Sequence, residues 1–158
     1  MKTSIAALVI AASGAWPVSA AAQQADGTPH TAESVRQAVA TDKRGLVEKN
    51  MHLTPEEAKR FRPIYDEYQR RLAPITAKQN RAVIDYIESE GSMTDANAKR
   101  IVQEILEAES EEQKLRERTN KAMLSALPAR KAARYLQIEN KIRAINRYDL
   151  AERLPLVK

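Results

Sequence analysis

Apolar side chains in the part of the chain that follows Thr54 recur at alternating intervals of four and three residues. The positions that share this seam are Phe61, Tyr65, Tyr68, Leu72, Ile75, Gln79, Ala82 and Tyr86. Such a repeat predicts a long helix that packs lengthwise against another helix. Thr54, Pro55 and Glu57 form a capping box with proline at the first helical position, so the helix is predicted to begin there. Two internal prolines, Pro63 and Pro74, predict that it bends.

Three further segments have helical patterns, over residues 32–50, 94–126 and 128–154. The first has the weakest pattern, because Gly45 interrupts it and its apolar positions follow the helical spacing only loosely. The other two each begin at a capping threonine or at a proline, which mark helix starts. No segment shows the alternation of a strand, so the sequence predicts an all-α fold of four helices, two of them long.

The hairpin formed by the two long helices is predicted to be well packed at one end only. The helix over 94–126 starts with apolar residues, but its middle, 107–114, is almost wholly polar. A polar middle leaves little surface to bury against the neighbouring helix. We therefore expect a long bent hairpin that is flanked in sequence by one helix on either side.

The first residues predict export from the cytoplasm. Lys2 precedes an uncharged apolar stretch, Pro17 ends that stretch, and small residues follow it. This is the order of a secretory signal peptide, here residues 1–22, with cleavage after Ala20 or Ala22. The alternative is a membrane anchor, but the stretch is shorter than the roughly 20 apolar residues that cross a bilayer. We expect a periplasmic protein without membrane insertion after cleavage.

The composition fits one exported domain behind this leader. Residues 23–31 have little to bury and predict a disordered tail, and residues 32–158 are predicted to form one helical domain. The chain has no cysteine, so neither a lipid anchor nor a disulfide is expected. Its formal net charge is +5. Export and the absence of a zinc-finger or RNP-type pattern argue against nucleic acid as a partner.

Enzyme chemistry is not expected from these residues. The chain has two histidines and no glycine-rich phosphate loop or nucleophile elbow. Glu48, Met51 and His52 lie close enough in sequence to offer carboxylate, thioether and imidazole ligands to a copper- or zinc-like ion. An exposed histidine beside a helix cap explains the same residues more simply, so we expect no metal and no cofactor.

Two helix starts in the chain share a sequence pattern. Leu53 and Leu127 are each followed by an alanine five residues later and by an aromatic residue eight residues later. With the leader and the helices, this resembles the Spy/CpxP superfamily of periplasmic proteins, whose mark is a pair of LTXXQ helix starts. The first copy keeps Leu53, Thr54 and Pro55 but has Glu57 at the glutamine position. The second copy has Leu127 followed by Pro128, and a lysine at the glutamine position.

The resemblance implies a bent hairpin that pairs antiparallel with a second copy to form a curved cradle. Known members act as ATP-independent chaperones, as inhibitory partners of envelope-stress sensor kinases, or as metal-responsive sensors. Our leading hypothesis is a chaperone-like or envelope-stress adaptor protein that binds non-native or envelope polypeptides as a homodimer. The alternative is a metal-responsive or inhibitory periplasmic partner of a membrane sensor. A purely structural helical spacer is a third possibility.

The candidate client-binding surface lies on the first half of the helix that begins at Pro55. There an apolar seam is bordered by a basic fringe, which suits weak contacts with partly unfolded, partly acidic chains. The apolar candidates are Phe61, Ile64, Tyr65, Tyr68 and Leu72, and the basic candidates are Arg60, Arg62, Arg70 and Arg71. Because a thin curved molecule has little apolar surface to cover this seam, part of it is expected to stay exposed.

Overall fold

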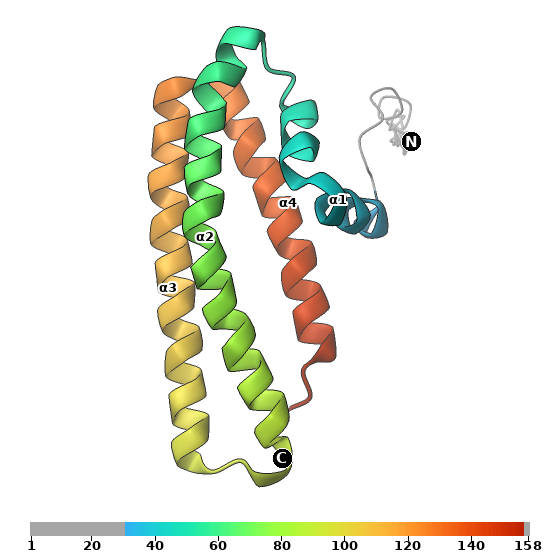
Figure 1. Cartoon of the computed structure of the whole chain (residues 1–158), viewed down its shortest axis with the longest axis vertical. Helices are drawn as coiled ribbons and strands as arrows, with labels where there is room; N and C mark the ends of the chain where they lie inside the picture. The colour runs from blue at the N-terminus through green and yellow to red at the C-terminus, as the bar shows by residue number, and fades with distance from the viewer. Residues whose placement is uncertain (1–30, 157–158) are drawn as a thin grey trace, which may run out of the picture.

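The computed structural model describes residues 31–156, which form an elongated arrangement of helices (Figure 1). The elements are α1 (Ala32–Met51), α2 (Pro55–Ser89), the short 3-10 helix η1 (Glu90–Ser92), α3 (Asp95–Ala126) and α4 (Ala129–Arg153). The predicted all-α fold of four helices is confirmed for this part of the chain. The predicted signal peptide and most of the predicted tail lie outside the described residues. Thr31, the last residue of that tail, is the N-cap of α1.

Helices α2 and α3 form the predicted hairpin and lie side by side (Figure 1). Gln79, the polar residue of the α2 seam, donates a hydrogen bond from Nε2 to Glu112 of α3 over 3.1 Å. Ala108 and Glu112 are both buried. The prediction that the polar middle of α3 leaves the hairpin unpacked there is therefore wrong. The small side chain of Ala108 lets α3 approach α2 closely, and the buried carboxylate of Glu112 has a hydrogen-bond partner in Gln79.

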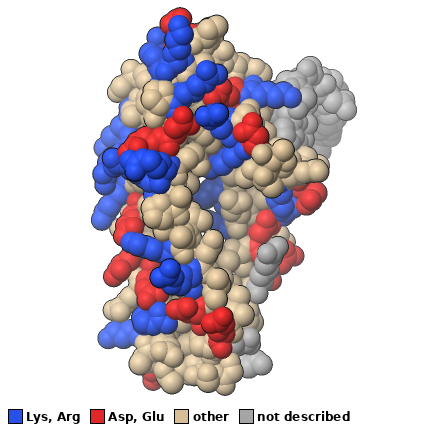
Figure 2. Space-filling view, viewed as in Figure 1, with Lys and Arg blue, Asp and Glu red and all other residues tan. Residues whose placement is uncertain are grey.

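The end of the hairpin next to η1 does leave large apolar side chains exposed. They are Ile84 and Ile87 on α2 and Val102 and Leu106 on α3. Figure 2 shows that uncharged side chains gather at this lower end, whereas charged ones crowd the upper part of the same face. The two ends of the hairpin therefore differ in surface chemistry.

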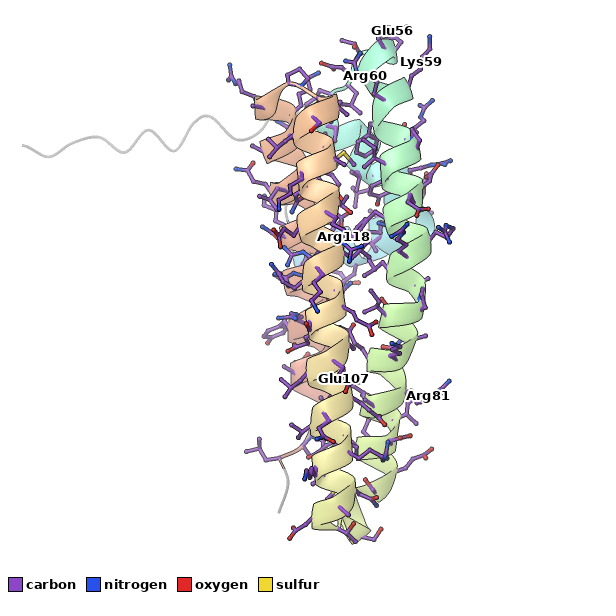
Figure 3. All side chains as sticks on the ribbon, turned by 90° about the vertical axis from the view of Figure 1, so that its left-hand side faces the viewer. Glu56, Lys59, Arg60, Arg81, Glu107 and Arg118 are labelled. Atoms are coloured by element: carbon purple, nitrogen blue, oxygen red, sulfur yellow. The ribbon has the colours of Figure 1, made fainter. Side chains whose placement is uncertain are left out.

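The outer face of the hairpin, which points away from α4, is charged. Two ion pairs join the helices there, Lys78 with Glu111 over 2.8 Å and Arg100 with Asp85 over 3.0 Å. Arg81 of α2, like Glu107 and Arg118 of α3, points outward on this face (Figure 3). Such a face is ordinarily solvated, so apolar binding is expected on the opposite side.

The main break in a helix lies in α1 and not at the prolines of α2. Helix α2 continues through Pro63 and Pro74, both of which are exposed. In α1, Asp42 has non-helical dihedral angles (φ −156°, ψ 87°), and its carboxylate accepts the backbone N–H of Gly45 over 2.8 Å. A Cβ at position 45 would lie 2.1 Å from this carboxylate. Asp42 therefore caps the second half of α1, and glycine gives the cap its room.

The core contains an aromatic cluster of Phe61, Tyr65, Tyr68 and Tyr135, contributed by α2 and α4, and extends to Ala108, Leu115 and Met123 of α3. Phe61 stacks on Tyr65 with 5.2 Å between ring centroids. Tyr135 of α4 meets both rings edge-on, at 6.0 and 6.3 Å. Such pairs add roughly 0.5–1.5 kcal/mol each beyond the area that they bury. This cluster fixes the first half of α4 against α2.

The α1–α2 junction is held on α4 by the two residues that stand at the glutamine positions of the LTXXQ pattern, Glu57 and Lys131. Glu57 accepts the backbone N–H of Thr54 over 2.8 Å and the Lys131 ammonium over 2.6 Å. Lys131 also donates to the carbonyl of His52, and Arg134 donates to that of Asn50. These donors satisfy carbonyls at the end of α1 that have no partner within the helix. The acid in one motif and the base in the other are thus a matched pair.

None of the helices in the described part of the chain is long and apolar enough to cross a membrane. The antiparallel pairing with a second copy stays a prediction.

We predict that Glu57 and Lys131 stabilise the fold as a pair. E57Q and K131Q should each lower the urea midpoint of unfolding, because each leaves one charge near the junction without its partner. The double variant E57Q/K131Q should recover more than half of the summed loss, since two amides can hydrogen-bond to each other. Additive losses in this double-mutant cycle would show that the two side chains act independently.

The stabilising effect of Glu57 should also depend on pH. Hydrogen bonds from Lys131 and then from the Thr54 backbone hold the pKa of Glu57 below its ordinary value. Its contribution is therefore present above the unfolded carboxyl pKa of about 4.3 and is lost as pH falls through the folded pKa. Urea midpoints of the natural chain and of E57Q should converge as the pH falls through the lowered pKa of Glu57 in the folded chain. A constant difference between them down to acid pH would contradict this assignment.

Candidate functional site

The aromatic side chains predicted to bind clients lie in the core. Phe61 is 0 %, Tyr65 1 % and Tyr68 4 % exposed. Ile64 and Leu72 are half-buried and pack against the same core. The prediction of an accessible surface is wrong for Phe61 and Tyr65, because α4 and the second half of α1 pack over this face of α2. Tyr68, although mostly buried, lines the cleft described below.

The four arginines of the predicted basic fringe are engaged within the chain. Their partners are the carbonyl of Ala126 for Arg60, Glu48 for Arg62, and Glu67 for both Arg70 and Arg71. Hydrogen bonds from these arginines hold the pKa of Glu48 and Glu67 below the ordinary value. Each arginine of the fringe has a partner within the chain, but Glu48 and Glu67 offset only two of the four positive charges.

The three weak candidates for metal ligands do not converge. Met51 is buried in the core, and Glu48 is bound by Arg62. His52 lies with its Nε2 3.0 Å from the guanidinium of Arg134. Within the described residues, no group of three or more His, Cys, Asp or Glu side chains could hold a metal ion.

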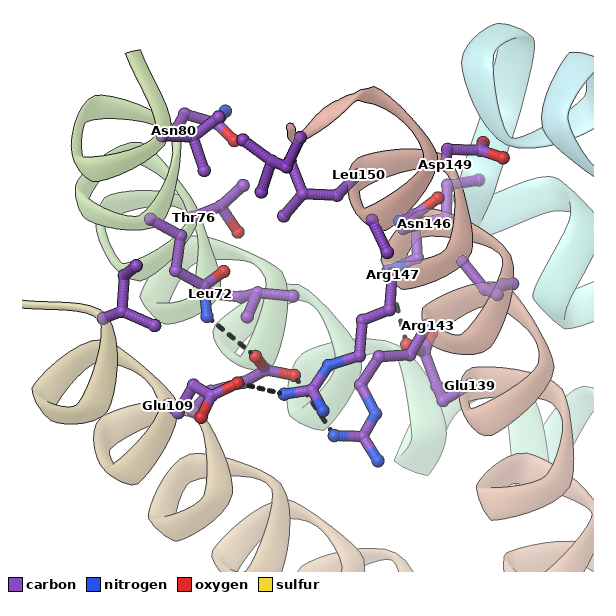
Figure 4. Close-up of a pocket in the computed structure, with 18 of the residues that line it drawn as sticks. Leu72, Thr76, Asn80, Glu109, Glu139, Arg143, Asn146, Arg147, Asp149 and Leu150 are labelled. Carbon is purple, nitrogen blue, oxygen red and sulfur yellow. Dashed lines mark hydrogen bonds and ion pairs between the residues drawn. The ribbon is translucent and has the colours of Figure 1, made fainter. Parts of the chain in front are cut away.

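A cleft of about 630 Å³ opens where the second half of α4 lies apart from the hairpin (Figure 4). Helices α2, α3 and α4 wall it, and Lys43 of α1 reaches its edge. Its volume falls within the roughly 300–1,000 Å³ that ligand pockets occupy. We take this cleft as the candidate functional site.

Apolar side chains from all three helices line the cleft. They are Tyr68, Leu72 and Val83 of α2, Ile105 of α3, and Ile142, Leu150 and Leu154 at the end of the chain. Ile142, Asn146 and Leu150 follow at intervals of four residues, so they share one face of α4. Leu72 and Leu150 project from opposite walls (Figure 4).

Four carboxylates line the cleft, and each is paired with a base. The pairs are Glu109–Arg147 at 3.1 Å, Glu112–Arg143 at 3.9 Å, Glu139–Lys43 at 3.3 Å and Asp149–Arg36 at 2.6 Å. Glu139 is buried and also accepts the Tyr65 hydroxyl over 3.3 Å. Burial lowers the pKa of Arg143, and nearby Arg116 and Arg147 lower it further.

The residues that follow α4 return to the hairpin at one end of the cleft. The Tyr86 hydroxyl donates a hydrogen bond to the carbonyl of Pro155 over 2.5 Å. Leu154, the residue before this proline, lines the cleft. The second half of α4 is therefore held mainly by polar contacts, in contrast to the aromatic packing of its first half.

Sequence reasoning missed this cleft, although it named Leu72 and Tyr68. A usable signal is present in the last helix, where Glu139 lies four residues after Tyr135 and three before Ile142. Residues at these intervals share a helix face, so this carboxylate is placed within an apolar stripe. A charge in such a stripe indicates an internal ion pair. Glu139 forms this pair with Lys43, and both residues line the cleft.

Comparison of the chain with protein-family models, with curated proteins and with solved structures gave no match. The resemblance to the Spy/CpxP superfamily therefore stays a prediction that rests on the two helix starts and the leader.

We predict that Phe61 and Tyr65 are needed for stability and not for accessible binding. Y65A should lower the free energy of unfolding by about 3–5 kcal/mol, because it leaves a cavity in the cluster. I84A, on an exposed part of the same helix, should change it by less than about 0.5 kcal/mol. Urea denaturation followed by circular dichroism measures both. A Y65A loss as small as that of I84A would show that the cluster opens readily.

Proposed function

We propose that this chain is a periplasmic, chaperone-like protein that binds non-native polypeptide segments in the cleft between the hairpin and α4, without nucleotide. The cleft is the observation that carries the proposal. Unfolded chains differ from folded ones chiefly in their exposed apolar side chains, and the cleft offers apolar walls to receive them. The predicted leader and the resemblance to periplasmic chaperones support the same function.

Two of the exposed apolar residues near η1, Ile87 and Val102, extend this binding surface. Val102 lies one helical turn before Ile105, which lines the cleft, and Ile87 lies one turn beyond Val83. Side chains three or four residues apart share a helix face, so both lengthen the cleft wall toward the hairpin end. Exposed apolar surface next to a cleft is typical of interaction sites. A bound segment can therefore exceed the length of the cleft itself.

Aggregation of a disulfide-reduced client protein tests this function directly. The mature chain from Gln23, added without ATP, should suppress light scattering at near-stoichiometric ratios. No suppression by a chain that circular dichroism shows to be folded would contradict the proposal. A pull-down from envelope extract with one dominant stoichiometric partner would favour the alternative, a dedicated partner of a membrane sensor.

Replacing an apolar side chain of the cleft by serine should weaken the suppression of client aggregation more than the same replacement outside the cleft. L150S or I105S should raise the concentration needed for half-suppression roughly tenfold, because losing about 1.5 kcal/mol of apolar contact costs that factor in affinity. L124S is the matched control, since Leu124 is an exposed leucine of α3 that does not line the cleft. Equal effects of L150S and L124S on suppression would show that clients do not bind in the cleft.

A further inference from the structure

We infer that the cleft selects uncharged, aliphatic polypeptide segments and does not attract acidic or basic ones. This inference rests on the proposed function and names the class of segment that the cleft takes. It differs from the sequence-based expectation of a basic rim that recruits acidic clients.

The acidic side chains on the cleft walls are all paired with bases. Each of the four acids that line the cleft has a Lys or Arg partner within 4 Å, as the pairs given above show. Three of these bases also line the cleft, and Arg36, which does not, is 2.6 Å from Asp149, so the four pairs together carry no net charge. A segment that enters therefore meets apolar surface together with charges that are already neutralised.

A charged segment has little to gain in such a cleft. Its charge would lose part of its hydration, and no unpaired opposite charge is available to compensate. A wall residue could offer an opposite charge only if its own ion pair opened. An aliphatic segment pays no such cost and gains about 1.5–3 kcal/mol for each large side chain that it buries fully. Selection between the two classes follows from this difference.

Substitutions in the Glu109–Arg147 pair should change which charge the cleft prefers in a bound segment. The pair bridges α3 and α4 across the cleft (Figure 4). Both side chains are about half exposed, at 45 % and 51 %, so replacing either should leave the fold intact. E109Q frees Arg147 as an unpaired cation in the cleft wall, and R147Q frees Glu109 as an unpaired anion. The two variants should therefore change the preferred charge of the guest in opposite directions.

The outer face of the hairpin supplies a matched control. Lys78 and Glu111 form an exposed ion pair that also bridges two helices, but neither residue lines the cleft. K78Q and E111Q change the net charge of the molecule as R147Q and E109Q do. They should leave the choice of segment unchanged.

The experiment is fluorescence anisotropy with three labelled peptides of equal length and the mature chain. One peptide contains only Leu, Val, Ala and Asn, and the others carry two Glu or two Lys in place of two Asn. The uncharged peptide should bind at least about tenfold more tightly than either charged one, a difference of about 1.4 kcal/mol. Its affinity should change less than about twofold between roughly 0.05 and 0.3 M NaCl, because salt screens only charge–charge attraction.

With the variants, E109Q should strengthen binding of the acidic peptide and R147Q that of the basic one, each by about threefold or more at low salt. Equal affinities for all three peptides, or the same preference in both variants, would overturn the inference while leaving the proposed function standing. No binding of any peptide by the folded chain would overturn both. If E109Q and R147Q change self-association and not peptide affinity, the cleft belongs to a second copy and the inference fails.

Discussion

The edge-on packing of Tyr135 against Phe61 and Tyr65 is the contact on which the rest of the structure depends. The chain has one phenylalanine and five tyrosines, and four of these six rings form the cluster. The few aromatic side chains are thus concentrated at one place in the core. That core fastens the first half of α4 to α2, and the Glu57–Lys131 pair fastens the α1–α2 junction to the same helix.

The cleft follows from where this packing ends. Beyond Ile142, α4 presents Arg143 and Arg147 toward the hairpin, and these side chains pair with Glu112 and Glu109 of α3 instead of packing as a core. The helix is thereby held at a distance, and Leu72, Ile105 and Leu150 keep a shared space open to solvent. A firm core at one end and ion-paired walls at the other produce a stable scaffold with an accessible apolar site.

Much of the fold could be predicted from local signals. The capping box at Thr54 and the proline at position 128 marked helix starts, because such signals act within a few residues. Tertiary partners could not be predicted in the same way. The seam through Phe61 and Tyr65 is real, but nothing in its spacing shows that α4 covers it. The Arg62–Glu48 pair likewise depends on how α1 crosses α2, and the break at Asp42 depends on a cap inside a continuous helical pattern.

We propose that the cleft, and not the buried rings of Phe61 and Tyr65 or the outer face, receives the bound segment. Methyl NMR of the mature chain, labelled at Ile and Leu and titrated with the uncharged peptide, tests it most directly. The account predicts concentration-dependent shifts at Ile105, Ile142 and Leu150, with Ile84 and Leu124 unchanged. Shifts confined to Ile84 and Leu124, or a general loss of signal from the core, would contradict it.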